Sequence, residues 1–154
     1  MYVATPQLWP VLAIFLAISI PLAITDAKEF RLPIWLNLSL SFFGLLGPAI
    51  ASVASGNPYS ITATIPATLI GASFLVIFLF AGENLGFGDV ILIFGLSLYT
   101  GYISYLHALA ALLIGCLLTL TWITLRKIKG DPNKHIPFGP GLIVGTLVTL
   151  VLPV

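Results

Sequence analysis

Long apolar stretches separated by short polar connections constrain this chain more than any other feature of its sequence. A helix needs about 20 apolar residues to cross the hydrocarbon core of a bilayer, and each stretch approaches that length. Because 59% of the residues are apolar and only 7% are charged, the chain lacks the polar surface that a water-exposed fold requires. We therefore expect an all-α fold, a polytopic membrane helix bundle with about six transmembrane helices. The expected helices are Leu8–Thr25, Pro33–Ala54, Ile65–Ala81, Val90–Leu106, His107–Leu125 and Ile136–Leu152.

The sequence outside these stretches is short, so residues 1–154 are expected to form a single membrane-embedded domain. The first basic residue is Lys28, so the opening stretch lacks the basic region of a cleaved signal peptide and is expected to remain as a span. A net charge of +1 gives no basis for binding nucleic acid. Because Cys116 is the only cysteine and His107 and His135 stand far apart, we expect neither a disulfide nor a metal site.

The charged residues predict how the bundle lies in the membrane. Basic residues occur only in the first and fifth connections, and cytoplasmic loops collect Lys and Arg. Because odd-numbered connections share one side, we expect both termini outside and connections one, three and five in the cytoplasm. The acids lie in or beside the same three connections, although the positive-inside rule does not govern them. Chemistry at the cytoplasmic face would explain the acids, which are Asp26, Glu29, Glu83, Asp89 and Asp131.

Asp26 and Asp89 each lie at the cytoplasmic end of an expected helix. Asp26 follows Thr25, and Asp89 precedes the unbroken apolar run Val90–Phe94. Ionisable groups at such depths usually face the bundle interior and carry function. Two carboxylates that approach closely share one proton over a range of pH. The ionised group can then take a proton from water that attacks a carbonyl, while its partner protonates the leaving amine.

Taken singly, each aspartate also has a structural interpretation. A lone Asp at the start of a helix is more often an N-cap or an interfacial residue than a catalyst. Asp89 is well placed to cap the helix Val90–Leu106. The motifs around the two aspartates therefore decide between the alternatives.

Three short motifs resemble those of one family of membrane proteases. Gly86-Phe87-Gly88-Asp89 matches the GxGD signature of membrane-embedded aspartyl proteases. The segment DAKEFRLP, from Asp26 to Pro33, is similar to the prepilin peptidase motif in which an aspartate is followed by basic residues and an Ile-Pro or Leu-Pro pair. The segment KHIPFGP, from Lys134 to Pro140, resembles the start of the last helix in that family. On these motifs the chain is identified as a member of the type IV prepilin peptidase and preflagellin peptidase family.

The resemblance implies an aspartyl endopeptidase of the inner membrane that needs no cofactor. It would remove the short basic leader from prepilin-like precursors (type IV pilins, archaellins or pseudopilins) at the cytoplasmic face, with Asp26 and Asp89 as the catalytic pair. Some members also methylate the new N-terminus through an added segment with paired cysteines, and we expect no methylation here because the chain lacks that segment. The residues expected to shape the site are Pro33, Gly86, Gly88, Lys134, Pro137, Phe138, Gly139 and Pro140.

The chain departs from the family pattern at two positions. The family often has Asn after the Leu-Pro pair, where this chain has Ile34, and Lys two residues after the GxGD aspartate, where it has Ile91. Loss of that cation should raise the pKa of Asp89, with Lys28 or Lys134 as candidates to replace it. These departures keep an alternative open, which is a catalytically weak or inactive relative that binds pilin precursors for assembly.

Several residues receive a secondary role. Glu29 and Glu83 are expected either to attract the basic leader or to be solvated loop acids. Gly86 and Gly88 are expected to leave room for a peptide beside Asp89. Gly141 and Gly145 form a GxxxG pair that predicts helix packing, Tyr99 is expected at the membrane interface, and Asn37-Leu38-Ser39 fits a glycosylation sequon that lies unused inside a span.

Two other protein classes fit the sequence less well. Presenilin-like and signal-peptide-peptidase-like proteases share the GxGD signature, but they have longer chains and a late Pro-Ala-Leu element, where this chain has Ile136–Pro140. A small transporter that uses an acid pair for protons would need charges deeper in the spans. Here the charges cluster at one end of each span.

Overall fold

A computed structural model of the chain consists of packed helices, with no strand among the residues that it describes. Its helices are α1 (Trp9–Glu29), α2 (Ile34–Ser55), α4 (Phe87–Gly101), α5 (Tyr105–Ile128) and α6 (Gly139–Val151). The expected helix Ile65–Ala81 lies largely outside the described residues, and those of its residues that are described are helical. The structure describes residues 8–29, 31–56, 65, 68–73, 76, 80, 86–128 and 137–151.

In the part of the chain that the structure describes, three helices are long and apolar enough to cross a membrane: α1, α2 over Ile34–Ala54, and α5. The shorter helices α4 and α6 are also apolar. A 15-residue helix such as α4 is about 22 Å long, which is less than the ~30 Å hydrocarbon core. The all-α membrane bundle expected from the sequence is confirmed.

Several helix boundaries differ by a few residues from their expected positions; α4, for example, begins at Phe87 rather than at Val90. Helix α1 continues four residues beyond Thr25, which places Asp26 inside its last turn rather than after it. The break between α4 and α5 lies at residues 102–104 and not near His107. The reason is a helix start signal at Ser104, whose hydroxyl oxygen accepts a hydrogen bond from the backbone N–H of Leu106 at 3.2 Å.

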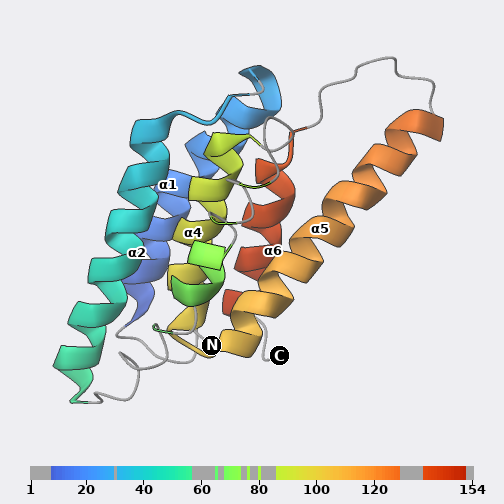
Figure 1. Cartoon of the computed structure of the whole chain (residues 1–154). Coiled ribbons are helices and arrows are strands. Elements are labelled where there is room, and N and C mark those ends of the chain that lie inside the picture. Colours follow the sequence, from blue (N-terminus) through green and yellow to red (C-terminus); the bar gives the residue numbers. More distant parts are fainter. Residues whose placement is uncertain are drawn as a thin grey trace.

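The C-terminal ends of α1 and α5 lie at the same end of the bundle as the N-terminal ends of α2, α4 and α6 (Figure 1). All charged residues in the described ranges belong to these helix ends or to the α1–α2 connection, so we name this the charged end. It comprises Asp26, Lys28, Glu29, Arg31, Asp89, Arg126 and Lys127. The clustering expected from the sequence is confirmed for the described charges, and the assignment of this end to the cytoplasm stays a prediction.

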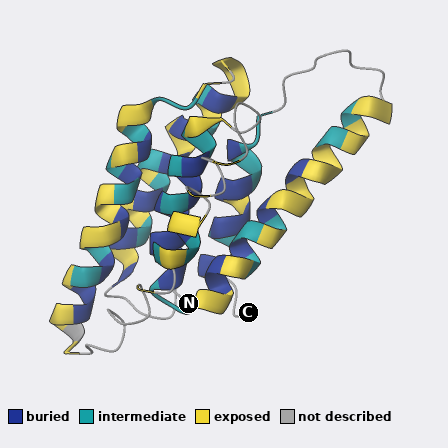
Figure 2. Ribbon diagram, viewed as in Figure 1, coloured by how far each residue is buried: buried dark blue, intermediate teal, exposed yellow. Residues whose placement is uncertain are grey.

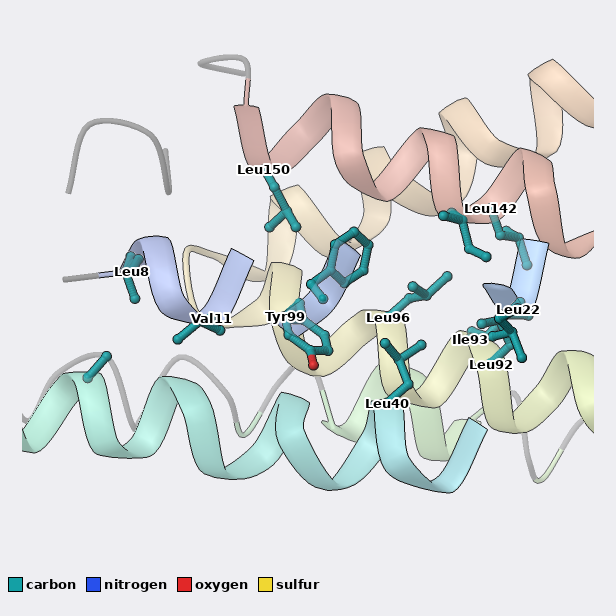
Figure 3. Packing of buried hydrophobic residues seen from close by; sticks show 13 residues of the cluster. Leu8, Val11, Leu22, Leu40, Leu92, Ile93, Leu96, Tyr99, Leu142 and Leu150 are labelled. Atoms are coloured by element: carbon teal, nitrogen blue, oxygen red, sulfur yellow. The ribbon is translucent and has the colours of Figure 1, made fainter. Parts of the chain in front are cut away.

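Helix α4 lies inside the bundle and packs against α2, α5 and α6 (Figures 1 and 2). A helix that is apolar all round is typical of such a position, and every residue of α4 from Gly95 to Gly101 is buried. The labelled side chains of Figure 3 come from α1, α2, α4, α6 and Leu8, and they share one apolar core. Tyr99 is fully buried there and meets the Phe15 ring edge-on at 5.0 Å, so its expected place at the membrane interface is wrong.

Helices α5 and α6 touch through glycines. A Cβ at Gly145 would lie 2.5 Å from the backbone nitrogen of Gly115 and 2.6 Å from the carbonyl oxygen of Ala111. The packing role predicted for the Gly141–Gly145 pair is confirmed, because a Cβ at Gly141 would also meet α5, at Thr119. Toward the charged end α5 diverges from α6, and most of its surface there is exposed (Figures 1 and 2).

Candidate active site

The carboxylate of Asp26 is buried at the charged end of α1, with the residue only 5% exposed. Its Oδ2 accepts a hydrogen bond of 2.9 Å from the backbone N–H of Gly139, the first residue of α6. The first N–H groups of a helix have no partner within the helix, so they are ready donors to an anion. The motif that begins the last helix therefore holds the aspartate of the first.

Asp89 is the third residue of α4 and lies just before the apolar run that begins at Val90. Of its alternative structural roles, that of N-cap is wrong, because the N-cap of α4 is Gly86 and no side chain caps the helix. Burial, and secondly the negative charge of Asp26, raise the pKa of Asp89 to about 6. The two aspartates are thus close enough for their charges to interact.

Leu32, in the connection between α1 and α2, lies between the two aspartate motifs. A Cβ at Gly88 would come within 2.9 Å of the Leu32 Cβ, and one at Gly139 within 3.4 Å of its Cδ2. The Leu-Pro pair thus contacts both the GxGD turn and the start of α6. Three segments that are far apart in the sequence converge at Leu32.

The glycines of the site serve close contact rather than an unusual backbone conformation. Gly86 has an ordinary extended φ of −69°, and a Cβ there would lie 2.9 Å from Oδ2 of Asp89. A Cβ at Gly139 would lie 2.7 Å from Oδ2 of Asp26. The space expected for a peptide beside Gly86 and Gly88 is taken up by the Asp89 carboxylate and by Leu32.

The sequence interpretation missed Asn37 as a site residue. This side chain is fully buried on α2, and its Nδ2 donates a 2.9 Å hydrogen bond to the carbonyl oxygen of Gly88. The signal available in the sequence was an amide within an apolar helix, which is costly to bury without a partner. We had assigned it only to an unused sequon.

A groove of about 330 Å³ opens between α5 and α6, on the side where α5 diverges. Its walls are mostly apolar and include Trp122, Pro140 and Val144, and Ala27 lines it directly beside Asp26. The Arg126 guanidinium lies 5.5 Å from the centre of the Trp122 ring at one margin of the groove. An apolar segment of a bound peptide that lies in this groove would therefore be close to Ala27, the residue that follows Asp26.

The other predicted residues fall into two groups. Pro33 is the N-cap of α2, Pro137 lines the groove, Phe138 packs against the core, and Pro140 occupies the first turn of α6, where proline is well tolerated. Glu29 is exposed at the end of α1. Glu83 and Lys134 lie outside the described residues.

Comparisons with known proteins show which family the chain belongs to. The sequence profile of the type IV leader peptidase family matches residues 12–124. The chain is 32% identical over 152 residues to the prepilin leader peptidase/N-methyltransferase of Pectobacterium carotovorum subsp. carotovorum, an alignment that covers 94% of this chain and 52% of that protein. The chain thus spans about half the length of this curated relative, and no solved structure matches it. This chain belongs to the type IV leader peptidase family.

Proposed function

We propose that this protein is an aspartyl endopeptidase that cleaves the short basic leader from prepilin-like precursors at the cytoplasmic face of the membrane. The observation that carries the proposal is that Asp26 is buried and Asp89 half-buried at the charged end, on two different helices, and that the charge of Asp26 acts on Asp89. Membership of the leader peptidase family supports the substrate class. The expectation of no methyltransferase activity stays a sequence prediction.

The chemistry follows from one proton shared by the two carboxyl groups. The ionised carboxylate takes a proton from water as the water oxygen bonds to the scissile carbonyl carbon. The protonated partner gives its proton to the amide nitrogen, and the carbon–nitrogen bond breaks to leave a new carboxyl and amino terminus. The raised pKa of Asp89 favours this residue as the protonated partner. Burial raises the pKa of Asp26 as well, but the hydrogen bond from Gly139 opposes that rise and so favours Asp26 as the carboxylate.

The groove between α5 and α6 supports a place for the substrate. A precursor that presents its leader in the cytoplasm and an apolar helix in the bilayer meets the enzyme at the charged end. Apolar residues that follow the cut would then lie against Trp122 and Val144, and the peptide bond would reach Asp26 past Ala27. Glu29 and Glu83 remain candidates to attract the basic leader.

The test is cleavage of a prepilin-like precursor by the purified protein in detergent or lipid, beside Asp26→Asn and Asp89→Asn. These variants keep the side-chain shape but remove the carboxylate, so we expect product from the wild type and none from either variant. Ser39→Ala is a suitable control, because Ser39 is only half-buried on α2 and its hydroxyl donates to the Trp35 carbonyl of its own helix. Equal cleavage by wild type and both variants would contradict the proposal.

A second candidate function is a catalytically weak or inactive relative that binds pilin precursors for assembly. The observation that favours it is Ile91, which stands where the family often has Lys. Burial and the charge of Asp26 both raise the pKa of Asp89, and Ile91 supplies no positive charge to oppose them. The same assay separates the two functions. A wild type that binds the precursor without cutting it at any pH would favour the inactive relative.

A further inference from the structure

Asn37 is a buried amide whose one hydrogen bond reaches the catalytic motif. Its residue is 0% exposed, and its Nδ2 donates to the Gly88 carbonyl at 2.9 Å. Within the described part of the chain its Oδ1 has no hydrogen-bond partner. Burying a polar atom without a partner is unfavourable, so an apolar side chain of the same shape would suit the helix packing better. The amide therefore serves its bond to Gly88 rather than the packing of α2.

Hydrogen bonds in the first turns of α2 hold the backbone of Asn37 in place. The carbonyl oxygen of Pro33, the N-cap of α2, accepts hydrogen bonds from the N–H groups of Leu36 at 3.1 Å and of Asn37 at 3.2 Å. One turn further along, the Ser41 hydroxyl donates to the Asn37 carbonyl at 3.0 Å. A Cβ at Gly95 of α4 would come within 2.9 Å of the Ser41 Oγ, so α2 and α4 are in close contact there.

The acceptor of this bond belongs to the peptide unit that carries the nitrogen of Asp89. In the first turn of α4, the N–H of Asp89 donates to the Gly86 carbonyl at 3.0 Å, and its carboxylate lies over Gly86. A carbonyl oxygen has two lone pairs, so Gly88 can accept from the side chain as well as from its own helix. Fixing the Gly88 carbonyl therefore fixes the direction in which the Asp89 side chain leaves the backbone.

We infer that Asn37 is a positioning residue for catalysis, whose amide holds the Gly88 peptide so that Asp89 is presented to Asp26. The inference rests on the proposed function. Asn37 does not touch the reacting atoms, and its effect passes through Gly88 alone. Loss of the amide frees the first turn of α4 while the apolar contacts of the bundle remain.

The experiment compares wild type with Asn37→Leu, which keeps a similar volume but cannot donate, and with Asn37→Ala as a smaller second variant. The matched control is Ser39→Ala, which removes the hydrogen bond from the Ser39 hydroxyl to the Trp35 carbonyl on the same helix. Cleavage of a prepilin-like precursor in detergent gives kcat, KM and their pH dependence, and thermal unfolding reports the fold.

We expect kcat to fall about tenfold or more in both Asn37 variants with KM little changed, since a misplacement of about 1 Å can cost about 10²-fold. The alkaline limb of the pH profile should move to lower pH, because an Asp89 released toward solvent loses the burial that raises its pKa. Ser39→Ala should keep the wild-type kcat and pH profile.

An unchanged kcat in a folded Asn37 variant of an active wild type overturns the inference and leaves the proposed function standing. Loss of the folded protein in both variants, with Ser39→Ala folded, also overturns it, because Asn37 would then hold the bundle rather than the aspartate. A wild type that cuts no precursor overturns the proposed function and the inference together.

Discussion

At the residue scale, each aspartate owes its state to a neighbour from another part of the chain. Gly139 donates its backbone N–H to Asp26 across a separation of 113 residues, and Asp26 in turn raises the pKa of Asp89. An anion at a helix N-terminus is stabilised by the exposed N–H groups, whereas a second carboxylate in the same buried space is disfavoured as an anion. The pair is therefore built to carry one proton.

This pairing predicts how cleavage depends on pH. The folded-state pKa of Asp89 is raised to about 6, so the shared proton is lost as the pH rises through this value and both groups become ionised. We expect kcat/KM to fall on the alkaline side with a midpoint near pH 6. Cleavage that still increases well above neutral pH would contradict the assignment of Asp89 as the protonated partner.

The effect of the Asp26 charge on the pKa of Asp89 can also be measured without an activity assay. Asp26→Asn removes the neighbouring charge but leaves the burial of Asp89, so the pKa of Asp89 should fall and still remain above its ordinary value. NMR titration of the Asp89 carboxyl carbon in wild type and variant gives both values. An identical titration in the two proteins would mean that the carboxylates do not interact.

Gly139→Ala tests the contact between α6 and Asp26. The added Cβ would lie 2.7 Å from the Asp26 Oδ2, so the carboxylate must move away from the N–H that it accepts. We expect kcat to fall about tenfold or more, because catalysis is sensitive to small displacements of a reacting group. The measurement is precursor cleavage with thermal unfolding alongside.

The control is Gly47→Ala on α2, far from the aspartates, where a Cβ would meet only the side chain of Val11 at 3.1 Å. This variant should keep the wild-type kcat. An equal loss of activity in both variants would point to a general effect of alanine on the bundle, contrary to the role given to Gly139.

At the element scale, helices α5 and α6 combine a close contact with a divergence. Gly115 and Gly145 bring the two backbones together at one level, and toward the charged end α5 diverges and leaves the groove lined by Trp122 and Val144. Small residues at a crossing allow such close approach in membrane bundles. The point at which α5 and α6 cross therefore determines where the groove opens, which is beside Ala27, the residue that follows Asp26.

Val144→Trp is predicted to fill this groove and to hinder the apolar part of the substrate. KM for a prepilin-like precursor should rise about tenfold, which corresponds to about 1.4 kcal/mol of lost binding. Val151→Trp places the same side chain at a similarly exposed position on α6 but outside the groove, so it should leave KM unchanged. Equal values of KM for the two variants would exclude the groove as the substrate site.

At the scale of the whole molecule, the charges of the described residues gather at one end of an apolar bundle. Lys28 belongs to this charged end, whereas Tyr105 begins α5 at the opposite end and is half exposed. Because basic residues are retained on the cytoplasmic side, the bundle should be inserted with the charged end inward. This orientation is what brings Asp26 and Asp89 to cytoplasmic leaders.

Cysteine labelling tests this orientation. Starting from Cys116→Ala, which removes the one native cysteine, Lys28→Cys and Tyr105→Cys are treated with a membrane-impermeant maleimide. We expect Tyr105→Cys to react in intact cells and Lys28→Cys to react only after the membrane is opened. The reverse pattern would contradict the predicted orientation, and with it the access of the aspartates to cytoplasmic leaders.

The sequence alone determined the class of fold and predicted Asp26 and Asp89 as the catalytic pair, because span length and short motifs are local properties that a reader can count along the chain. It also placed α2 to within a residue, since Pro33 and Gly56 mark its two ends. The tertiary structure decided the Gly139–Asp26 hydrogen bond, the position of Leu32 between the two motifs, and the hydrogen bond from Asn37 to Gly88, 51 residues away. These contacts depend on how the helices pack, and packing joins residues whose separation along the chain carries no periodic signal.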